Sequence, residues 1–182
     1  MRGFLIRAIK LLRDDAGSIQ LAHPVTGELT LRVQLGVAGL TNDHMLDLAH
    51  IAFASGKRYV IDDVNRSPLV SDKRVRDLLM NAGIRSMQCT PLTLRPGYNV
   101  GVLSTCGSRP HAPLREDLSV LDVLASSAAE LVERMHAKQR RRVRRERFRR
   151  VRSLAGIAVF EWSPVSGEMR GDPGFTALCG LP

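Results

Sequence analysis

The sequence predicts an α+β fold, in which an antiparallel sheet is flanked by helices and a long C-terminal helix leads to a small hairpin and helix. Three patterns carry this prediction. Apolar and polar residues alternate in residues 19–35, which is typical of half-buried strands. Two apolar runs in residues 84–107 surround a Pro-Gly turn, which is typical of a β-hairpin. Several other segments repeat apolar residues at three- and four-residue spacing, which is typical of helices.

Length and composition allow one well-formed hydrophobic core. The chain has 182 residues, of which 44% are hydrophobic and 25% charged, enough to bury one domain core and part of a second. Arg7 and Lys10 interrupt the N-terminal apolar stretch before a signal peptide could form. Three cysteines without CxxC spacing indicate neither a disulfide framework nor a zinc site. We therefore expect a cytoplasmic protein with reduced thiols.

The first part of the chain predicts a helix, a hairpin and a second helix. Residues 4–12 carry their apolar side chains on one helical face. Residues 19–35 form the predicted hairpin around a turn that contains Pro24. Residues 42–55 begin with polar cap residues and stop before Gly56, as a helix does.

A short strand at residues 58–61 and a polar loop precede the third predicted helix. For this helix we expect Ser71 as the N-cap. Its buried face is predicted to consist of Val75, Leu78 and Leu79, which lie at helical spacing.

The hairpin of residues 84–107 raises a redox hypothesis. If its turn is centred on Gly97 and Tyr98, the register places Cys89 directly opposite Cys106. Two adjacent thiols could form a redox-sensing pair, because reactive thiols need access and a partner. Buried cysteine is also a common core residue, and inert core thiols are the interpretation we favour.

From Pro113 onward the pattern predicts one long helix. Glu116 and Asp117 suit its positively polarised start. An apolar seam with three- and four-residue spacing follows, formed by Leu118, Leu121, Leu124, Ala125, Ala128, Leu131, Val132 and Met135. This seam can pack on the sheet or on a second copy of itself, and we expect a homodimer through the helix from Leu121 to Met135.

The net charge of +9 comes from one segment. Residues 134–152 contain 11 Lys or Arg and one acid, so the rest of the chain is nearly neutral. A cationic stripe at three- and four-residue spacing is formed by Arg134, Lys138, Arg141, Arg145, Arg149 and Arg152. We interpret it as a solvated linker helix. The alternative is a nucleic-acid-binding protein that uses this helix on backbone phosphates, or contact with an anionic membrane surface; one aromatic residue and no base-reading motif argue against nucleic acid.

No residue pattern indicates catalysis or metal binding. The five histidines are scattered, without the two-histidine helical pair that zinc enzymes use. No Ser-His-Asp set, phosphate-binding loop, kinase phosphoacceptor helix or ATP-binding box is visible. We therefore expect no metal, no cofactor and no enzymatic activity in this chain; kinase activity would belong to a longer parent protein.

The last segment, residues 153–182, predicts a separate structural unit. An apolar strand, a turn at Ser166 and Gly167, a second short strand and a helix near Pro173 are predicted. About 30 residues cannot bury a stable core alone, so we expect this piece to be incomplete or to lean on another part.

In the order of its predicted elements and in the residues of several stretches, this sequence resembles a GAF domain of bacterial sensor proteins, notably histidine kinases of two-component systems. The stretches that carry the resemblance are GSIQLAHPVTGELTL, IDDVNRSPLV, AGIRSMQCTPL, GVLST and LDVLASSAAELVER. The terminal AGIAVFEWSPVSGEMRGDPGFTALCGLP is similar to the opening third of a PAS domain. The resemblance implies a GAF-like domain at residues 1–135, an Arg-rich linker helix at 136–152 and a truncated PAS-like segment at 153–182.

The resemblance also implies a function. It suggests a non-catalytic sensory input module, with helices on one face of a sheet and a small-molecule pocket on the other, that relays a signal through its C-terminal helix. The Asn-Lys, Phe and Asp-Glu pattern of cyclic-nucleotide-binding GAF domains is missing, as is the cysteine that holds a bilin. The ligand therefore stays unidentified.

Overall fold

The structure is a computed structural model that describes residues 1–36, 42–155 and 157–180. The chain divides into two compact units, residues 1–134 and 135–182. The first contains a five-stranded antiparallel sheet and the second a two-stranded one. Helix α4 (Arg115–Leu154) begins in the first unit and ends in the second. The predicted α+β fold, with its flanked sheet, long helix and terminal hairpin, is confirmed.

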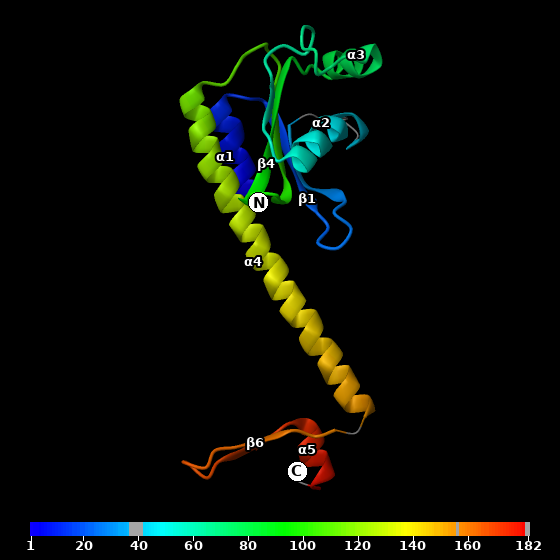
Figure 1. Ribbon diagram of the computed structural model, residues 1–182, viewed down its shortest axis with the longest axis vertical. Helices are drawn as coiled ribbons and strands as arrows, with labels where there is room; N and C mark the ends of the chain where they lie inside the picture. Colours follow the sequence, from blue (N-terminus) through cyan, green and yellow to red (C-terminus); the bar gives the residue numbers. More distant parts are fainter. Residues whose placement is uncertain (37–41, 156, 181–182) are drawn as a thin grey trace. The chain divides into compact units, whose positions relative to one another are not determined.

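The elements of the first unit follow the predicted order (Figure 1). Before α4 they are α1 (Arg2–Leu12), β1 (Ala16–Ala22), β2 (Leu29–Leu35), α2 (Asn42–Ser55), β3 (Tyr59–Ile61), α3 (Lys73–Asn81), β4 (Ser86–Arg95) and β5 (Tyr98–Gly107). The strands pair in the order β2-β1-β5-β4-β3, so the hairpin β4–β5 lies in the middle of the sheet.

Helices cover both faces of this sheet. Helices α1 and α4 lie side by side on one face, and α2 and α3 lie on the other (Figure 1). The resemblance implied helices on one face and a small-molecule pocket on the other, and in the structure α2 and α3 also cover this second face (Figure 1). The pocket described below lies beneath the helices of the second face.

The core on the α1 and α4 side explains the apolar seam of the long helix. Leu121, Ala125 and Val132 of α4 are buried against Leu5 of α1 and Leu103 of β5. Burying a side chain of this size contributes about 1.5–3 kcal/mol. The seam therefore packs mainly on its own sheet, the first of the two possibilities that the sequence allows.

The cap of α3 differs from the prediction by one residue. The Asp72 carboxylate accepts a hydrogen bond from the backbone N–H of Arg74, at 2.7 Å, and Asp72 rather than Ser71 is the N-cap. On the predicted buried face, Leu79 is buried but Leu78 is exposed. Both Ser and Asp cap helices well. In this structure the loop before α3 places Asp72 at the N-cap position.

The register of the β4–β5 hairpin also differs from the prediction. Arg95 pairs with Tyr98 across a two-residue turn, in which Gly97 adopts a left-handed φ of 77°. Tight hairpin turns favour glycine for this reason. As a result Cys89 lies opposite Ser104 rather than opposite Cys106. A shift of two residues keeps both thiols on the same face of the sheet.

The second unit holds β6 (Phe160–Trp162), β7 (Met169–Gly171) and α5 (Pro173–Leu178). The rings of Phe160 and Phe175 pack with their centroids 5.2 Å apart. Arg152, in the last turn of α4, forms an ion pair with Asp172, whose carboxylate also accepts the N–H of Phe175. In the described part of the chain, no helix is both long enough and apolar enough to cross a membrane.

Candidate functional site

A pocket of about 450 Å³ lies between α2, α3 and the sheet. Its walls are mainly apolar. Leu48 and Ile51 come from α2, Met87 from β4, Leu79 from α3 and Leu69 from the loop between β3 and α3. Such a volume and lining are typical of small-molecule sites in proteins.

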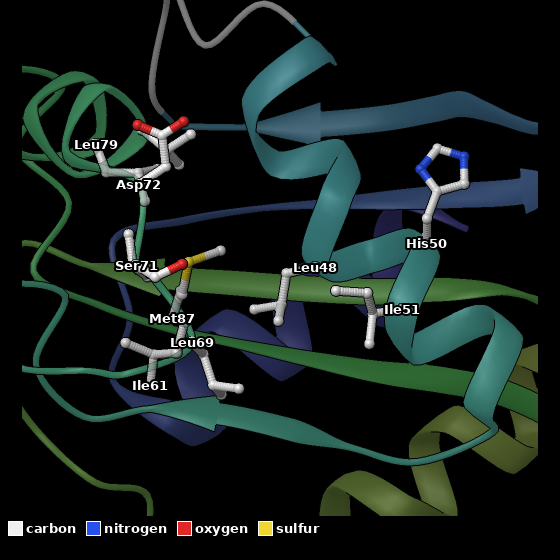
Figure 2. A pocket seen from close by; sticks show the side chains of 11 residues that line it. Leu48, His50, Ile51, Ile61, Leu69, Ser71, Asp72, Leu79 and Met87 are labelled. Carbon is white, nitrogen blue, oxygen red and sulfur yellow. The ribbon is translucent and has the colours of Figure 1, made fainter.

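The lining of the pocket also includes polar residues. His50, Ser71 and Asp72 contribute to the lining. In Figure 2, Leu48 and Ile51 extend from α2 toward the side of Met87, whereas His50 projects from the helix away from Met87. The Asp72 carboxylate already accepts the hydrogen bond that caps α3. The pocket therefore offers an apolar floor with few polar groups free to orient a ligand.

The loop that supplies Leu69 is held by its own backbone. The Asp63 carbonyl accepts hydrogen bonds from the N–H groups of Arg66 and Ser67, and the Asp63 carboxylate accepts one from Asn65 at 2.9 Å. Asp and Asn commonly organise turns in this way. Among the described residues, no three His, Cys, Asp or Glu side chains gather as a metal site.

A chain of buried polar side chains crosses the opposite face of the sheet. The Arg58 Nε donates to Thr90 Oγ1 at 2.8 Å, and the Thr90 hydroxyl donates to Gln88 Oε1 at 2.6 Å. Gln88 Nε2 then donates to Thr105 Oγ1 at 3.1 Å. At the other end, the Arg58 guanidinium forms an ion pair with Asp122 of α4. Every donor in this chain points the same way, from Arg58 toward Thr105.

Arg58 joins the two faces of the first unit. It follows the end of α2, which lines the pocket, and contacts Asp122 of α4 on the far side of the sheet. The Asp122 side chain is 64% exposed, so this ion pair is screened by solvent and contributes little stability. The pair marks a point of contact between α4 and the segment that follows α2.

The two redox candidates are buried in the core on the pocket side. Cys89 is 0% and Cys106 2% exposed. Desolvation by burial raises the pKa of each thiol to about 12. A hydrogen bond from Ser104 opposes this rise at Cys89, and the Asp14 charge adds to it at Cys106. Both groups are therefore protonated at neutral pH, and the thiol is the unreactive form.

Thiol labelling tests this assignment. We expect a chromogenic disulfide reagent to modify Cys179 rapidly in the native chain, since it is the exposed cysteine, and to leave Cys89 and Cys106 unmodified until the protein unfolds. Mass spectrometry of digested peptides locates the label. A Cys179→Ser variant serves as the control, and rapid labelling of that variant in its native state would contradict the burial argument.

The predicted cationic stripe has an exposed middle and engaged ends. Lys138, Arg141, Arg145 and Arg149 are exposed. Arg134 forms an ion pair with Glu130 at 3.4 Å. Arg152 pairs with Asp172 and also lies over the ring of Phe148, 5.6 Å from its centroid. Because Arg134 is exposed in spite of its ion pair, the stripe presents five side chains to solvent along α4.

The sequence analysis assigned no residue to a pocket. It named Ser71, Val75 and Leu79 only as the cap and the buried face of the third helix, and it named neither member of the Arg58–Asp122 pair. The pocket side chains come from segments far apart in the sequence, so periodicity within one segment cannot assemble them. For Arg58, the available signal was a charged residue at the start of a predicted strand.

Solved structures with the same fold include several sensory proteins. A domain of a putative two-component sensor histidine kinase from Sinorhizobium meliloti 1021 has 17% identity and a TM-score of 0.63, covering 78% of this chain and 94% of that one. The GAF domain region of a putative membrane protein from Geobacter sulfurreducens PCA has 22% identity and a TM-score of 0.56, covering 72% and 94%. The photoproduct state of GAF3 from Slr1393 of Synechocystis sp. PCC6803 has 15% identity and a TM-score of 0.59, covering 76% and 94%.

Identities this low show a shared fold. No match is found among curated proteins. The family model of the GAF domain matches residues 5–132, which is more than half of the chain and includes the sheet, the pocket and the first part of α4. The chain therefore belongs to the GAF domain family.

Proposed function

We propose that this chain is a non-catalytic sensory input module of a bacterial signalling protein, of the kind found in the sensor histidine kinases of two-component systems. Its family membership and the sensory proteins among its structural neighbours support this role. The observation that carries it is the apolar pocket of about 450 Å³ between α2, α3 and β4. A cytoplasmic location fits its unpaired cysteines.

The pocket chemistry favours a small, mainly apolar ligand. Leu48, Ile51, Leu69 and Met87 offer dispersion contacts and a surface that gains from leaving water. Few polar side chains are available, and Asp72 already caps α3. A strongly charged ligand would lose its hydration there without gaining matching partners.

A blocked pocket provides the test. Native mass spectrometry of the purified chain, followed by denaturation, is expected to release a small molecule from the wild type and none from Leu69→Trp, whose indole fills the pocket. Leu78→Trp is the matched control, because Leu78 is exposed on α3 but does not line the pocket. Equal retention by both variants would place the bound molecule elsewhere.

We propose further that pocket occupancy is relayed to α4. A ligand that contacts Leu48 and Ile51 acts directly on α2. The end of α2 leads to Arg58, which is tied to Asp122 of α4 and to Thr90 of β4. A ligand shifts such an equilibrium only by its difference in affinity for the two positions of α2.

We also propose a homodimer through α4 between Leu121 and Met135. Its buried residues already pack on the sheet, so the contact falls to the outer face, where Val123 and Met135 are exposed and Leu124 and Leu131 are half-buried. Beyond this stretch, in-register cationic side chains of two helices would repel each other.

A single charge tests the dimer. Val123→Glu is expected to shift the chain from dimer to monomer, because it places a carboxylate opposite its counterpart in a second copy. Sedimentation equilibrium measures the change. Ser119→Glu, at an exposed position on the same helix, is the control, and a monomeric wild type would contradict the proposal.

The domain arrangement supports the same role. We propose a GAF domain at residues 1–135, a linker helix at 136–152 and a PAS-like segment at 153–182. The segment from 153 contains the hairpin β6–β7 and helix α5, and most of its large apolar side chains, Trp162 among them, are exposed. Such exposure is expected of a piece that packs against further structure.

A further inference from the structure

His111 lies in the connector between β5 and α4, at a corner where four elements meet. Its Nδ1 is 2.9 Å from Ser86 Oγ at the start of β4. Its Nε2 is 3.0 Å from the carbonyl oxygen of Leu12, the last residue of α1, and 3.7 Å from Asp14 Oδ1, just before β1. The ring therefore ties the segment that leads into α4 to the rest of the first unit.

The hydrogen bonds at this corner fix the number of protons on the ring. The Leu12 carbonyl only accepts, so Nε2 must carry a proton. The Ser86 hydroxyl donates to the carbonyl of Arg109, at 2.9 Å, and has no second proton for the ring. Nδ1 must then donate to Ser86 Oγ. All three contacts are satisfied together only when both ring nitrogens carry protons.

We propose that His111 is a proton-binding site that holds the β5–α4 connector closed as an imidazolium, and that loss of this proton releases the connector and makes the start of α4 responsive to pH. Three protons are needed for these contacts: one on each ring nitrogen and one on the Ser86 hydroxyl. A neutral ring supplies only one, so two protons remain for three contacts. One of these part-buried contacts then lacks its hydrogen bond, which favours an open connector.

The charges around the ring support the imidazolium. The Asp14 side chain is 3% exposed, and its Oδ1 has no hydrogen-bond partner among the described residues. The pKa of Asp14 is raised, mainly by burial, and a hydrogen bond with Thr105 and the charge of His111 oppose this rise. A carboxylate in this position is stabilised by a cation. The last carbonyls of α1 favour a cation as well.

The other charged groups at the corner have defined partners. The Asp15 carboxylate accepts a hydrogen bond from the backbone N–H of Ser108 at 2.7 Å, and its hydrogen bonds with Ser108 lower its pKa, with smaller contributions from Arg109 and His111. Cys106 carries no charge at neutral pH, because burial raises its pKa to about 12. The ring thus faces two carboxylates, Asp14 and Asp15, and one cation, Arg109.

The close approach at this corner depends on Gly107. A Cβ at this position would lie 2.9 Å from Asp14 Oδ1, 2.9 Å from Ser86 Oγ and 3.4 Å from His111 Cε1. The three side chains gather in the space that the missing side chain leaves. This observation is independent of where the protons lie, and it shows that the cluster is built into the packing of β5.

Hydrogen exchange of the full chain tests the proposal. We expect residues 108–115 to exchange about tenfold faster at about pH 8 than at about pH 6, after correction for the intrinsic rate, since one hydrogen bond to a charged group is lost. His111→Gln is expected to exchange fast at both pH values. His23→Gln, which changes an exposed histidine directly after β1, is expected to behave as the wild type in residues 108–115.

A second measurement decides the case if His111→Gln fails to fold. Nitrogen NMR of the wild type, with the His111 ring assigned by its contact with Asp14, is expected to show both nitrogens of that ring protonated at about pH 6 and one proton lost when the connector opens at about pH 8. Exchange of residues 108–115 that does not depend on pH, or a neutral His111 ring at about pH 6, would overturn the proposal.

Discussion

Gln88→Leu is expected to lower the free energy of unfolding by about 2–4 kcal/mol, because two buried hydroxyl groups each lose a partner. Gln88 is 1% exposed. Its Oε1 accepts from Thr90 and its Nε2 donates to Thr105, deep beneath α4. Leucine occupies a similar volume but replaces neither bond. Urea unfolding followed by circular dichroism measures the loss.

Gln20→Leu is the matched control. Gln20 is 4% exposed on β1, which is separated from β4 by β5, and its Oε1 has no hydrogen-bond partner among the described residues. The same substitution is therefore expected to change the free energy of unfolding by less than about 1 kcal/mol. Equal losses in the two variants would show that volume and shape, rather than the polar chain, decide the stability of this sheet.

Gly107→Ala is expected to lower the free energy of unfolding by about 1–3 kcal/mol through overpacking. The added methyl group would lie 2.9 Å from both Asp14 Oδ1 and Ser86 Oγ. Asp14 is buried and cannot move aside without breaking the corner around His111. Thermal unfolding of the full chain measures the effect, and we expect the pH dependence of exchange in residues 108–115 to weaken in the same variant.

Gly3→Ala serves as the control for this substitution. Gly3 lies in α1, and nothing is within 4 Å of the position that its Cβ would take. Alanine there is expected to raise stability by about 0.5–1 kcal/mol, because it favours the helix more than glycine does. If Gly107→Ala is as stable as the wild type, the methyl group fits at this position. That result would contradict the overpacking expected from the close contacts.

Local patterns predicted the elements of this fold but not their exact pairing. The spacing of apolar residues identifies α1, β2 and α4, because each pattern is a property of one continuous segment. The register of β4 and β5 depends on a two-residue turn and on bulges near Thr93. The spacing of apolar residues does not reveal the turn position or the bulges. The prediction that Cys89 lies opposite Cys106 was therefore wrong.

The candidate site was less accessible to sequence reasoning than the fold. The resemblance predicts that a pocket exists, whereas its walls are set by how α2 and α3 lie on the sheet. Leu69 reaches the pocket from a loop, and no helical or strand period marks it. The same holds for His111, whose partners Leu12, Asp14 and Ser86 are distant in sequence.

Communication between the pocket and α4 is best tested by hydrogen exchange with an apolar probe. N-Phenyl-1-naphthylamine, an uncharged dye whose fluorescence reports binding to apolar sites, is added to the full chain, and exchange is followed in α2 and in residues 115–134. We predict slower exchange in both segments of the wild type, and in α2 alone for Arg58→Met, which removes the contacts to Thr90 and Asp122. Protection of α2 in the wild type without any change in residues 115–134 would contradict the relay.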